Sequence, residues 1–161
     1  EWKVSEGEDR YRRGLYTFNK RTAPYTMFST FDAPSGELCL ARREPSNTPL
    51  QALTTLNSTV FIEASQHLAR EIVNSESATA EERIASLFRR AVIRPPDAAE
   101  LEVLRDFLNR QQQAFADHPE QAKLVAGEPT SVSSEQNIAD LAAWTALARV
   151  ILNLDETVTR P

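Results

Sequence analysis

Apolar residues recur at helical spacing along most of the chain beyond Thr48, and helix start signals precede several of these runs. The string Thr48-Pro49-Leu50-Gln51 combines a capping hydroxyl, a proline suited to the first helical position and a glutamine able to reach back to the cap. It predicts a helix that begins at Pro49 and turns three leucines inward: Leu50, Leu53 and Leu56. Asn57-Ser58-Thr59 should break this helix, because three weak helix formers follow one another there.

A second helix is predicted from this break to about Asn74, with an inward stripe at Phe61, Ala64, Ser65, Leu68 and Ile72. The third begins at a predicted capping box of Thr79 and Glu82. Its apolar residues follow the spacing of one helix face throughout: Ile84, Leu87, Phe88, Ala91 and Val92. Arg94-Pro95-Pro96 should end it, because the α conformation is disfavoured for a residue that precedes proline.

Two more long helices complete the pattern. Asp97-Ala98-Ala99-Glu100 forms a further predicted capping box, and the helix that it opens should end near His118-Pro119. A short helical piece is predicted over residues 120–126. Ser133-Ser134-Glu135-Gln136 then caps the last helix, which is expected to be central because its apolar face is wide: Ile138, Leu141, Ala142, Trp144, Leu147, Ala148, Ile151 and Leu152.

The first 48 residues lack this periodicity and contain most of the turn-forming residues. Tyr11, Leu15 and Phe18 suit a short helix, although strand propensity competes there. From Thr22 to Asn47 the pattern predicts an extended segment with Phe28 and Phe31 as apolar plugs. The predicted fold is therefore all-α: an irregular bundle of about five main helices, residues 49–161, with a long extended N-terminal arm, residues 1–48, packed across it in one single domain.

Composition and charge exclude several classes of protein. Apolar residues make up 41% of the 161 positions but are interrupted too often to span a bilayer, so no membrane insertion is expected. The single cysteine excludes an internal disulfide, a CxxCH haem attachment and a thiolate cluster. The net charge of −5 argues against nucleic acid as a partner. Residues 1–48 carry eight basic and seven acidic residues, whereas residues 49–161 carry ten and sixteen.

Five strings resemble a C-terminal domain of unknown function found in large exported proteins of planctomycetes and related bacteria. They are Arg12–Thr22, Thr30–Pro34, Arg42–Glu44 leading into Asn47–Leu53, Arg94–Pro96 and Leu152–Glu156. In that family the domain usually follows a planctomycete-type cytochrome c domain and another domain of unknown function. The resemblance implies an extracytoplasmic location, upstream domains of the same polypeptide as partners, and haem in that upstream part but no cofactor here. It implies no reaction, and the absence of an initiator methionine fits the expectation of a fragment.

Three sets of residues are candidates for chemistry, each with a plainer structural interpretation. Cys39 with His67 could form a thiol–histidine pair, but Cys39 is expected to pack as a small apolar residue. Glu63, His67 and Glu71 share a helix face that could hold a metal, yet a solvated polar face is the expectation. Asp155-Glu156 could act as paired carboxylates, but surface charge at a helix end is commoner. No catalytic or metal-binding residue is therefore predicted.

The constellation favoured for binding is cationic. Seven residues form the predicted site for an anion or a partner: Arg12, Arg13, Tyr16, Arg21, Asp32, Arg42 and Arg43. Guanidinium groups beside aromatic rings can hold a carboxylate, sulfate or phosphate, so an acidic glycan or an acidic protein would suit them. The competing interpretation is that the arginines tie the irregular arm down by pairing with Asp32, Glu44 or helix C-termini.

These observations predict a helical accessory domain of an exported, cytochrome c-associated protein that serves structure, docking or ligand binding and not catalysis. The alternative is part of an enzyme that acts on a surface or sulfated polysaccharide, with an active site completed by missing upstream domains.

Overall fold

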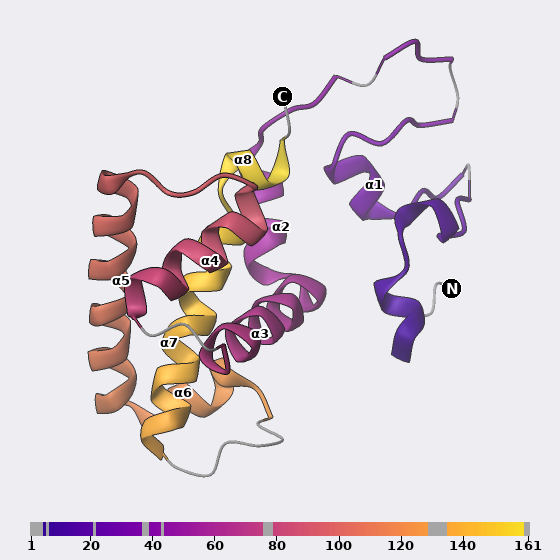
Figure 1. Cartoon of the computed structure of the whole chain (residues 1–161). Coiled ribbons are helices and arrows are strands. Elements are labelled where there is room, and N and C mark those ends of the chain that lie inside the picture. Colours follow the sequence, from indigo (N-terminus) through magenta and orange to yellow (C-terminus); the bar gives the residue numbers. More distant parts are fainter. Residues whose placement is uncertain are drawn as a thin grey trace. The chain divides into compact units, whose positions relative to one another are not determined.

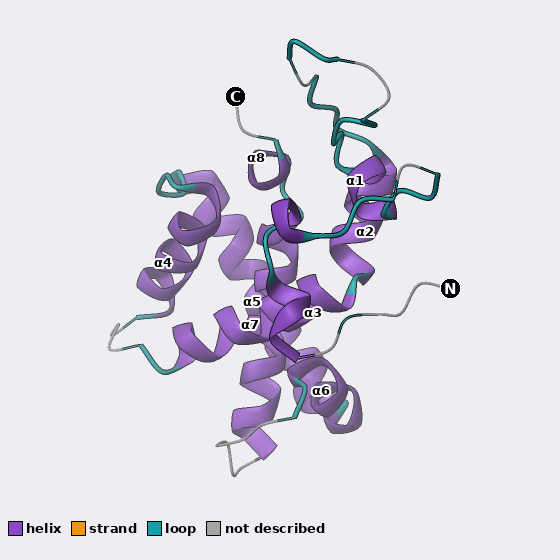
Figure 2. Cartoon of the chain, turned by 90° about the vertical axis from the view of Figure 1, so that its right-hand side faces the viewer, coloured by secondary structure: helices purple, strands orange, loops and turns teal. Residues whose placement is uncertain are grey.

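The structure is a computed structural model that describes residues 5, 7–20, 22–36, 39–42, 44–75, 79–128 and 135–159, the side chains of 135–137 excepted. Over these residues it contains eight α-helices, two short 3₁₀ turns and no strand, which confirms the predicted all-α class (Figures 1 and 2). The chain divides into two compact units. Unit 1 comprises Glu1–Thr54 and unit 2 comprises Thr55–Arg160.

Unit 2 contains the long helices that the periodicity predicts. They are α3 (Thr59–Val73), α4 (Ala80–Val92), α5 (Ala98–Asp117), α6 (Pro119–Ala126), α7 (Glu135–Leu152) and the short α8 (Asp155–Val158), preceded by the last residues of α2 (Pro49–Asn57). The predicted break is confirmed, because Ser58 between α2 and α3 has an extended backbone with ψ of 134°. Helix α8 was not predicted by the sequence pattern.

Helix α7 is the central element of unit 2, as its wide apolar face predicts. Helices α3, α5 and α6 all make their most extensive contacts with it. Its residues 141–145 are buried in an unbroken run, which means that the helix is covered on all sides over this stretch. Trp144, at 2% exposure, is the largest side chain in a core that otherwise consists mostly of leucine, isoleucine and alanine.

Two capping boxes fix the starts of α4 and α5 as predicted. The Thr79 hydroxyl accepts from the Glu82 backbone N–H while the Glu82 carboxylate accepts from the Thr79 N–H. Asp97 and Glu100 make the same exchange, with both distances at 2.8 Å. Each box satisfies two backbone donors that a helix start leaves without intrahelical acceptors.

Helix α4 ends in a conformation that its sequence does not favour. Ile93, directly after it, has φ of +71° in the left-handed region, where a β-branched side chain is strained. Its N–H donates to the Arg89 carbonyl, which gives the helix a C-terminal cap of the kind that glycine usually supplies. The prolines at positions 95 and 96 then keep the chain out of the helix.

Unit 1 consists of short elements: the 3₁₀ turns η1 (Gly7–Tyr11) and η2 (Gly14–Tyr16), helix α1 (Thr26–Thr30) and the first six residues of α2. In place of the predicted helix between Tyr11 and Phe18, the chain has the end of η1 and the three-residue turn η2. The prediction of an extended segment from Thr22 is wrong over α1, which is a full α-helical turn. Phe28 and Phe31 are both only partly buried. The packing of the arm across the bundle stays a prediction.

The inward face predicted for α2 is also wrong. Leu50 and Leu53 are 60% and 57% exposed, whereas Gln51 and Thr55 are buried. The reason is polar: the Gln51 side chain is held by hydrogen bonds inside unit 1, and the Thr55 hydroxyl donates to the Asn153 side chain inside unit 2. The hydrogen bonds of Gln51 and Thr55, four positions apart, therefore determine which face of α2 is buried.

Candidate functional site

The Asp32 carboxylate is the centre of a hydrogen-bond network in unit 1. The carboxylate accepts from the Ser46 backbone N–H at 2.7 Å, from the Ser46 hydroxyl at 2.8 and 2.9 Å and from the Gln51 amide at 3.2 Å. The same amide donates to the Thr30 carbonyl at 2.9 Å. Gln51 also completes the predicted cap, because its oxygen accepts from the Thr48 N–H. Asp32 thus ties the end of α1 to the start of α2 from a left-handed backbone position, φ +55°.

A second feature of unit 1 is a cation held against an aromatic ring. The Arg13 guanidinium lies 5.5 Å from the centre of the Tyr16 ring, and it donates to the Tyr16 hydroxyl at 3.3 Å. Between them, Gly14 lies directly on α1, since a Cβ added there would be 3.0 Å from the Phe28 ring. The Phe28 ring in turn meets Tyr25 edge to face. The turn that presents Arg13 is therefore seated on α1.

Large apolar side chains close to Arg13 in the sequence are exposed to solvent. Leu15 is 82% exposed, Phe18 71%, Tyr16 61% and Tyr11 60%. We call Tyr11, Arg13, Leu15, Tyr16 and Phe18 the aromatic–cationic surface.

The structure describes the remaining predicted arginines only in part. Arg12 pairs with Asp9 at 2.7 Å, an exposed ion pair of little energetic weight. Arg42 is exposed, and Arg21 and Arg43 lie outside the described residues. Of the seven, the structure brings together Arg13 and Tyr16, and it places the Asp32 carboxylate in the network described above.

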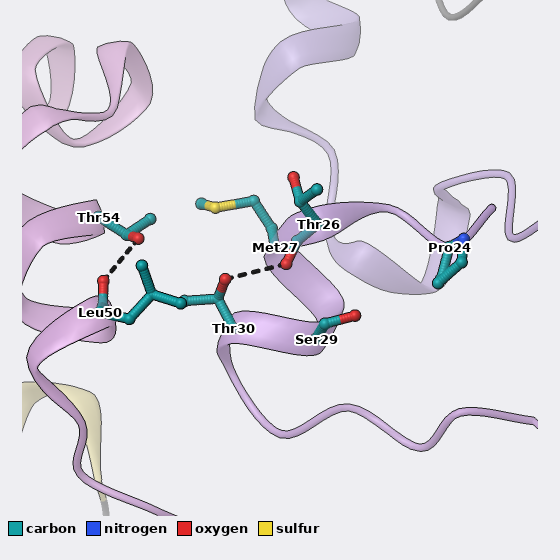
Figure 3. A pocket seen from close by; sticks show the side chains of 7 residues that line it. All are labelled: Pro24, Thr26, Met27, Ser29, Thr30, Leu50 and Thr54. Atoms are coloured by element: carbon teal, nitrogen blue, oxygen red, sulfur yellow. Dashed lines mark hydrogen bonds between the residues drawn. The ribbon is translucent and has the colours of Figure 1, made fainter.

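Unit 1 also has an open groove of about 570 Å³. Met27 of α1 and Leu50 of α2 line it, together with Pro24 and four hydroxyl side chains, and no charged residue takes part (Figure 3). Two of those hydroxyls are already used within their own helices, Thr30 donating to the Thr26 carbonyl and Thr54 to that of Leu50 (Figure 3). The groove therefore offers mainly apolar contact.

In unit 2 the main charged cluster is built around Arg94, which the sequence analysis named in a helix stop and in a family string but not as a site residue. Its guanidinium holds two carboxylates by paired hydrogen bonds, Glu100 at 2.7 and 2.8 Å and Glu156 at 2.7 and 2.8 Å. It also lies 5.1 Å from the centre of the Phe88 ring. The cluster joins the loop after α4 to α5 and α8.

This pairing changes the proton affinity of all three groups. The pKa of Glu100 falls to about 2, mainly because Arg94 donates to it and also because it accepts from the Asp97 N–H. Hydrogen bonds from Arg94 also lower the pKa of Glu156 and those two carboxylates raise the pKa of Arg94. All three groups remain charged at neutral pH, so the cluster acts as a clamp and not as an acid or base.

The other candidates for chemistry belong to different units or are engaged by other side chains. Cys39 is exposed in unit 1, which corrects the expectation that it packs as an apolar residue, because the described residues of its irregular segment include no buried hydrophobic side chain that could cover it. His67 belongs to unit 2 and is exposed, and Glu71 of the same column is engaged by Arg90. Within the described ranges, no group of three or more His, Cys, Asp or Glu side chains is placed to hold a metal.

Comparison with known proteins identifies a family. The model of a family described as "Protein of unknown function (DUF1553)", PSD1, matches residues 1–108. The chain belongs to the DUF1553 family. No curated protein and no solved structure matches it. The family match ends inside α5, so the end of the match is not the end of a structural unit.

The strings that carry the family resemblance turn out to be paired in space. Asp32 of the second string meets Gln51 of the third within unit 1. Arg94 of the fourth meets Glu156 of the fifth within unit 2, although the fifth string lies beyond the residues that the DUF1553 model matches. No helix in the described parts of this family member is long and apolar enough to cross a membrane.

Proposed function

We propose that this chain is a non-catalytic docking domain of an exported, cytochrome c-associated protein, in which unit 2 is a stable scaffold and unit 1 is the part that attaches. The observation that carries the proposal is the distribution of apolar side chains. Of the eleven large hydrophobic side chains found exposed among the described residues, eight lie in unit 1.

Unit 1 also lacks a hydrophobic core over its described residues. Among these residues the one buried side chain is polar, that of Gln51. A unit of this size cannot offset the conformational entropy of folding without burying apolar surface. Four of the exposed side chains fall between residues 11 and 18, and apolar side chains that gather on the surface of a folded protein mark an interaction site. The charged groups of unit 2 are by contrast engaged with one another, Arg94 with its two carboxylates above all.

The proposal is tested by the reactivity of one introduced thiol in two settings. Leu15→Cys in a Cys39→Ser background places a thiol on the aromatic–cationic surface, and Leu124→Cys is the matched control, because leucines 15 and 124 are 82% and 81% exposed. Maleimide should label both variants of the purified protein rapidly. In the cell envelope, labelling at position 15 should slow at least about tenfold while the control stays fast. Equal labelling of both positions in the envelope would refute a docking role.

A further inference from the structure

Cations and aromatic rings gather in one window of the sequence that begins directly after the acidic residues Glu8 and Asp9. Residues 10–31 contain five of the 18 basic residues and six of the twelve aromatic residues, and no aspartate or glutamate. The described side chains at its start are the most exposed apolar ones of unit 1, with Leu15 and Phe18 at 82% and 71%. An anionic partner with an apolar interior would complement both properties.

The position of these side chains on the turns of unit 1 indicates which kind of partner can bind them. They project from the two short turns η1 and η2 and from the residues that follow, and Gly14 seats the second turn on α1. The Arg13 guanidinium is already held over the Tyr16 ring, which reduces the side-chain entropy lost on binding. The groove of unit 1 is lined by other residues, from Pro24 onward. The aromatic–cationic surface therefore consists of protruding side chains.

We propose that residues 10–20 attach the domain to the surface of an anionic lipid bilayer. The inference rests on the proposed docking function and names its partner. Tyr11, Leu15, Tyr16 and Phe18 would enter the interfacial region, where aromatic side chains are favoured. Arg13 and the exposed Lys20 would meet the anionic headgroups.

A bilayer explains these features better than a protein or a glycan as the partner would. Protein interfaces concentrate their energy where an anchor side chain fills a pocket, and the protruding leucine and phenylalanine would need such pockets on the partner. A glycan is held by aromatic rings together with many polar side chains, yet Thr17 and Asn19 are the only neutral polar residues from Tyr11 to Lys20. A lipid surface supplies no pocket and requires protruding apolar groups with cations beside them, as found here.

The test is sedimentation of the whole chain with vesicles of phosphatidylcholine mixed with phosphatidylglycerol, and with vesicles of phosphatidylcholine alone. Binding is expected to the anionic vesicles and to weaken as salt is added, because headgroup attraction is screened. Arg13→Gln should weaken it about fivefold, the effect of one basic residue near such a surface. Leu15→Ser should weaken it at least about tenfold, because a leucine side chain no longer leaves water.

Each variant has a matched control in unit 2. Leu124→Ser removes an equally exposed leucine, and Arg89→Gln removes an exposed arginine from α4. Both should bind like the parent chain. A folding defect in either unit would be visible in the far-ultraviolet circular dichroism of the variant. The salt dependence of the unchanged chain tests the electrostatic attraction without any substitution.

Three outcomes would overturn the lipid proposal: no sedimentation with anionic vesicles, equal binding to both kinds of vesicle, or equal losses in test and control variants. Binding to sulfated dextran or to poly-glutamate in place of vesicles would assign the surface to a glycan or to an acidic protein. If vesicle binding fails while position 15 is still protected in the envelope, the docking function stands and its partner is not lipid.

Discussion

Gly127 offers the sharpest test of how unit 2 is held together. It follows α6 with φ of +72° and ψ of −171°, a combination that is essentially restricted to glycine. A Cβ added there would lie 2.7–2.8 Å from three side-chain atoms of Gln66 on α3. That glutamine donates to the Val125 carbonyl at 3.0 Å, and Arg70 donates to the Ala126 carbonyl at 3.3 Å. Side chains of α3 thus cap carbonyls that α6 cannot satisfy itself.

Gly127→Ala is expected to destabilise unit 2 through two additive effects. The backbone conformation costs about 1–3 kcal/mol for a residue with a Cβ. Displacement of the Gln66 side chain loses a hydrogen bond of about 0.5–1.5 kcal/mol. The sum is about 1.5–4.5 kcal/mol, which for a unit of this size corresponds to a decrease in melting temperature of roughly 7–20 °C.

Equilibrium unfolding in urea measures this loss directly. Trp144 is buried on α7 and reports on unit 2, provided that Trp2 is replaced by phenylalanine. A double-mutant cycle with Gln66→Ala separates the two effects, because the shorter side chain leaves room for the new methyl group. The cycle should show a coupling of about 1 kcal/mol, and the remaining loss is the backbone strain. A loss below about 0.5 kcal/mol in the single variant would refute the strain argument.

Three further predictions concern other parts of unit 2 and the start of α2. Leu147→Ala on α7, fully buried, should cost about 3–5 kcal/mol in urea unfolding, whereas Leu50→Ala, 60% exposed, should change stability by less than about 1 kcal/mol. Ile93→Gly should stabilise unit 2 by about 1 kcal/mol, measured as a higher melting temperature, because it relieves a left-handed β-branched residue that is 64% exposed. Arg94 lowers the pKa of Glu100 to about 2, below its value of about 4.3 in an unfolded chain. The Glu100 carboxylate therefore stabilises the fold fully above about pH 4.3, and this contribution is lost as the pH falls toward 2. Over that pH range the melting temperature of Glu100→Gln should fall by less than that of the parent chain.

The helices of unit 2 were predictable because local signals and burial agree there. Thr79 and Asp97 cap their helices as the sequence indicates, and Ile84, Leu87 and Phe88 of the α4 stripe are all buried. A helical stripe is reliable when enough apolar neighbours exist to cover it. Unit 2 has them, since its central helix α7 is covered from several sides.

Helix α2 shows where this reasoning fails. Its leucines follow the spacing of a buried stripe, yet the buried positions are Gln51 and Thr55. Their partners, Thr30, Asp32 and Asn153, are 19 to 98 residues away in the sequence, and periodicity contains no information about such hydrogen bonds. The exposure of Cys39 has a similar origin, because the sequence shows its apolar character but not that the described part of unit 1 buries no hydrophobic side chain.

The five family strings differ in whether their side chains form internal hydrogen bonds or are exposed to solvent. In each of the later strings a polar side chain forms a hydrogen bond within its own unit. Asp32 bonds with Gln51 in unit 1, and Arg94 bonds with Glu156 in unit 2. The first string differs, because Arg13 pairs with Tyr16 inside its own turn and the apolar side chains beside it are mostly in solvent. Burial of such side chains lowers free energy wherever a complementary surface is present. The string with the most exposed apolar surface is therefore the one through which we expect binding, whereas the bonds of the other strings stabilise unit 1 and unit 2, each from within.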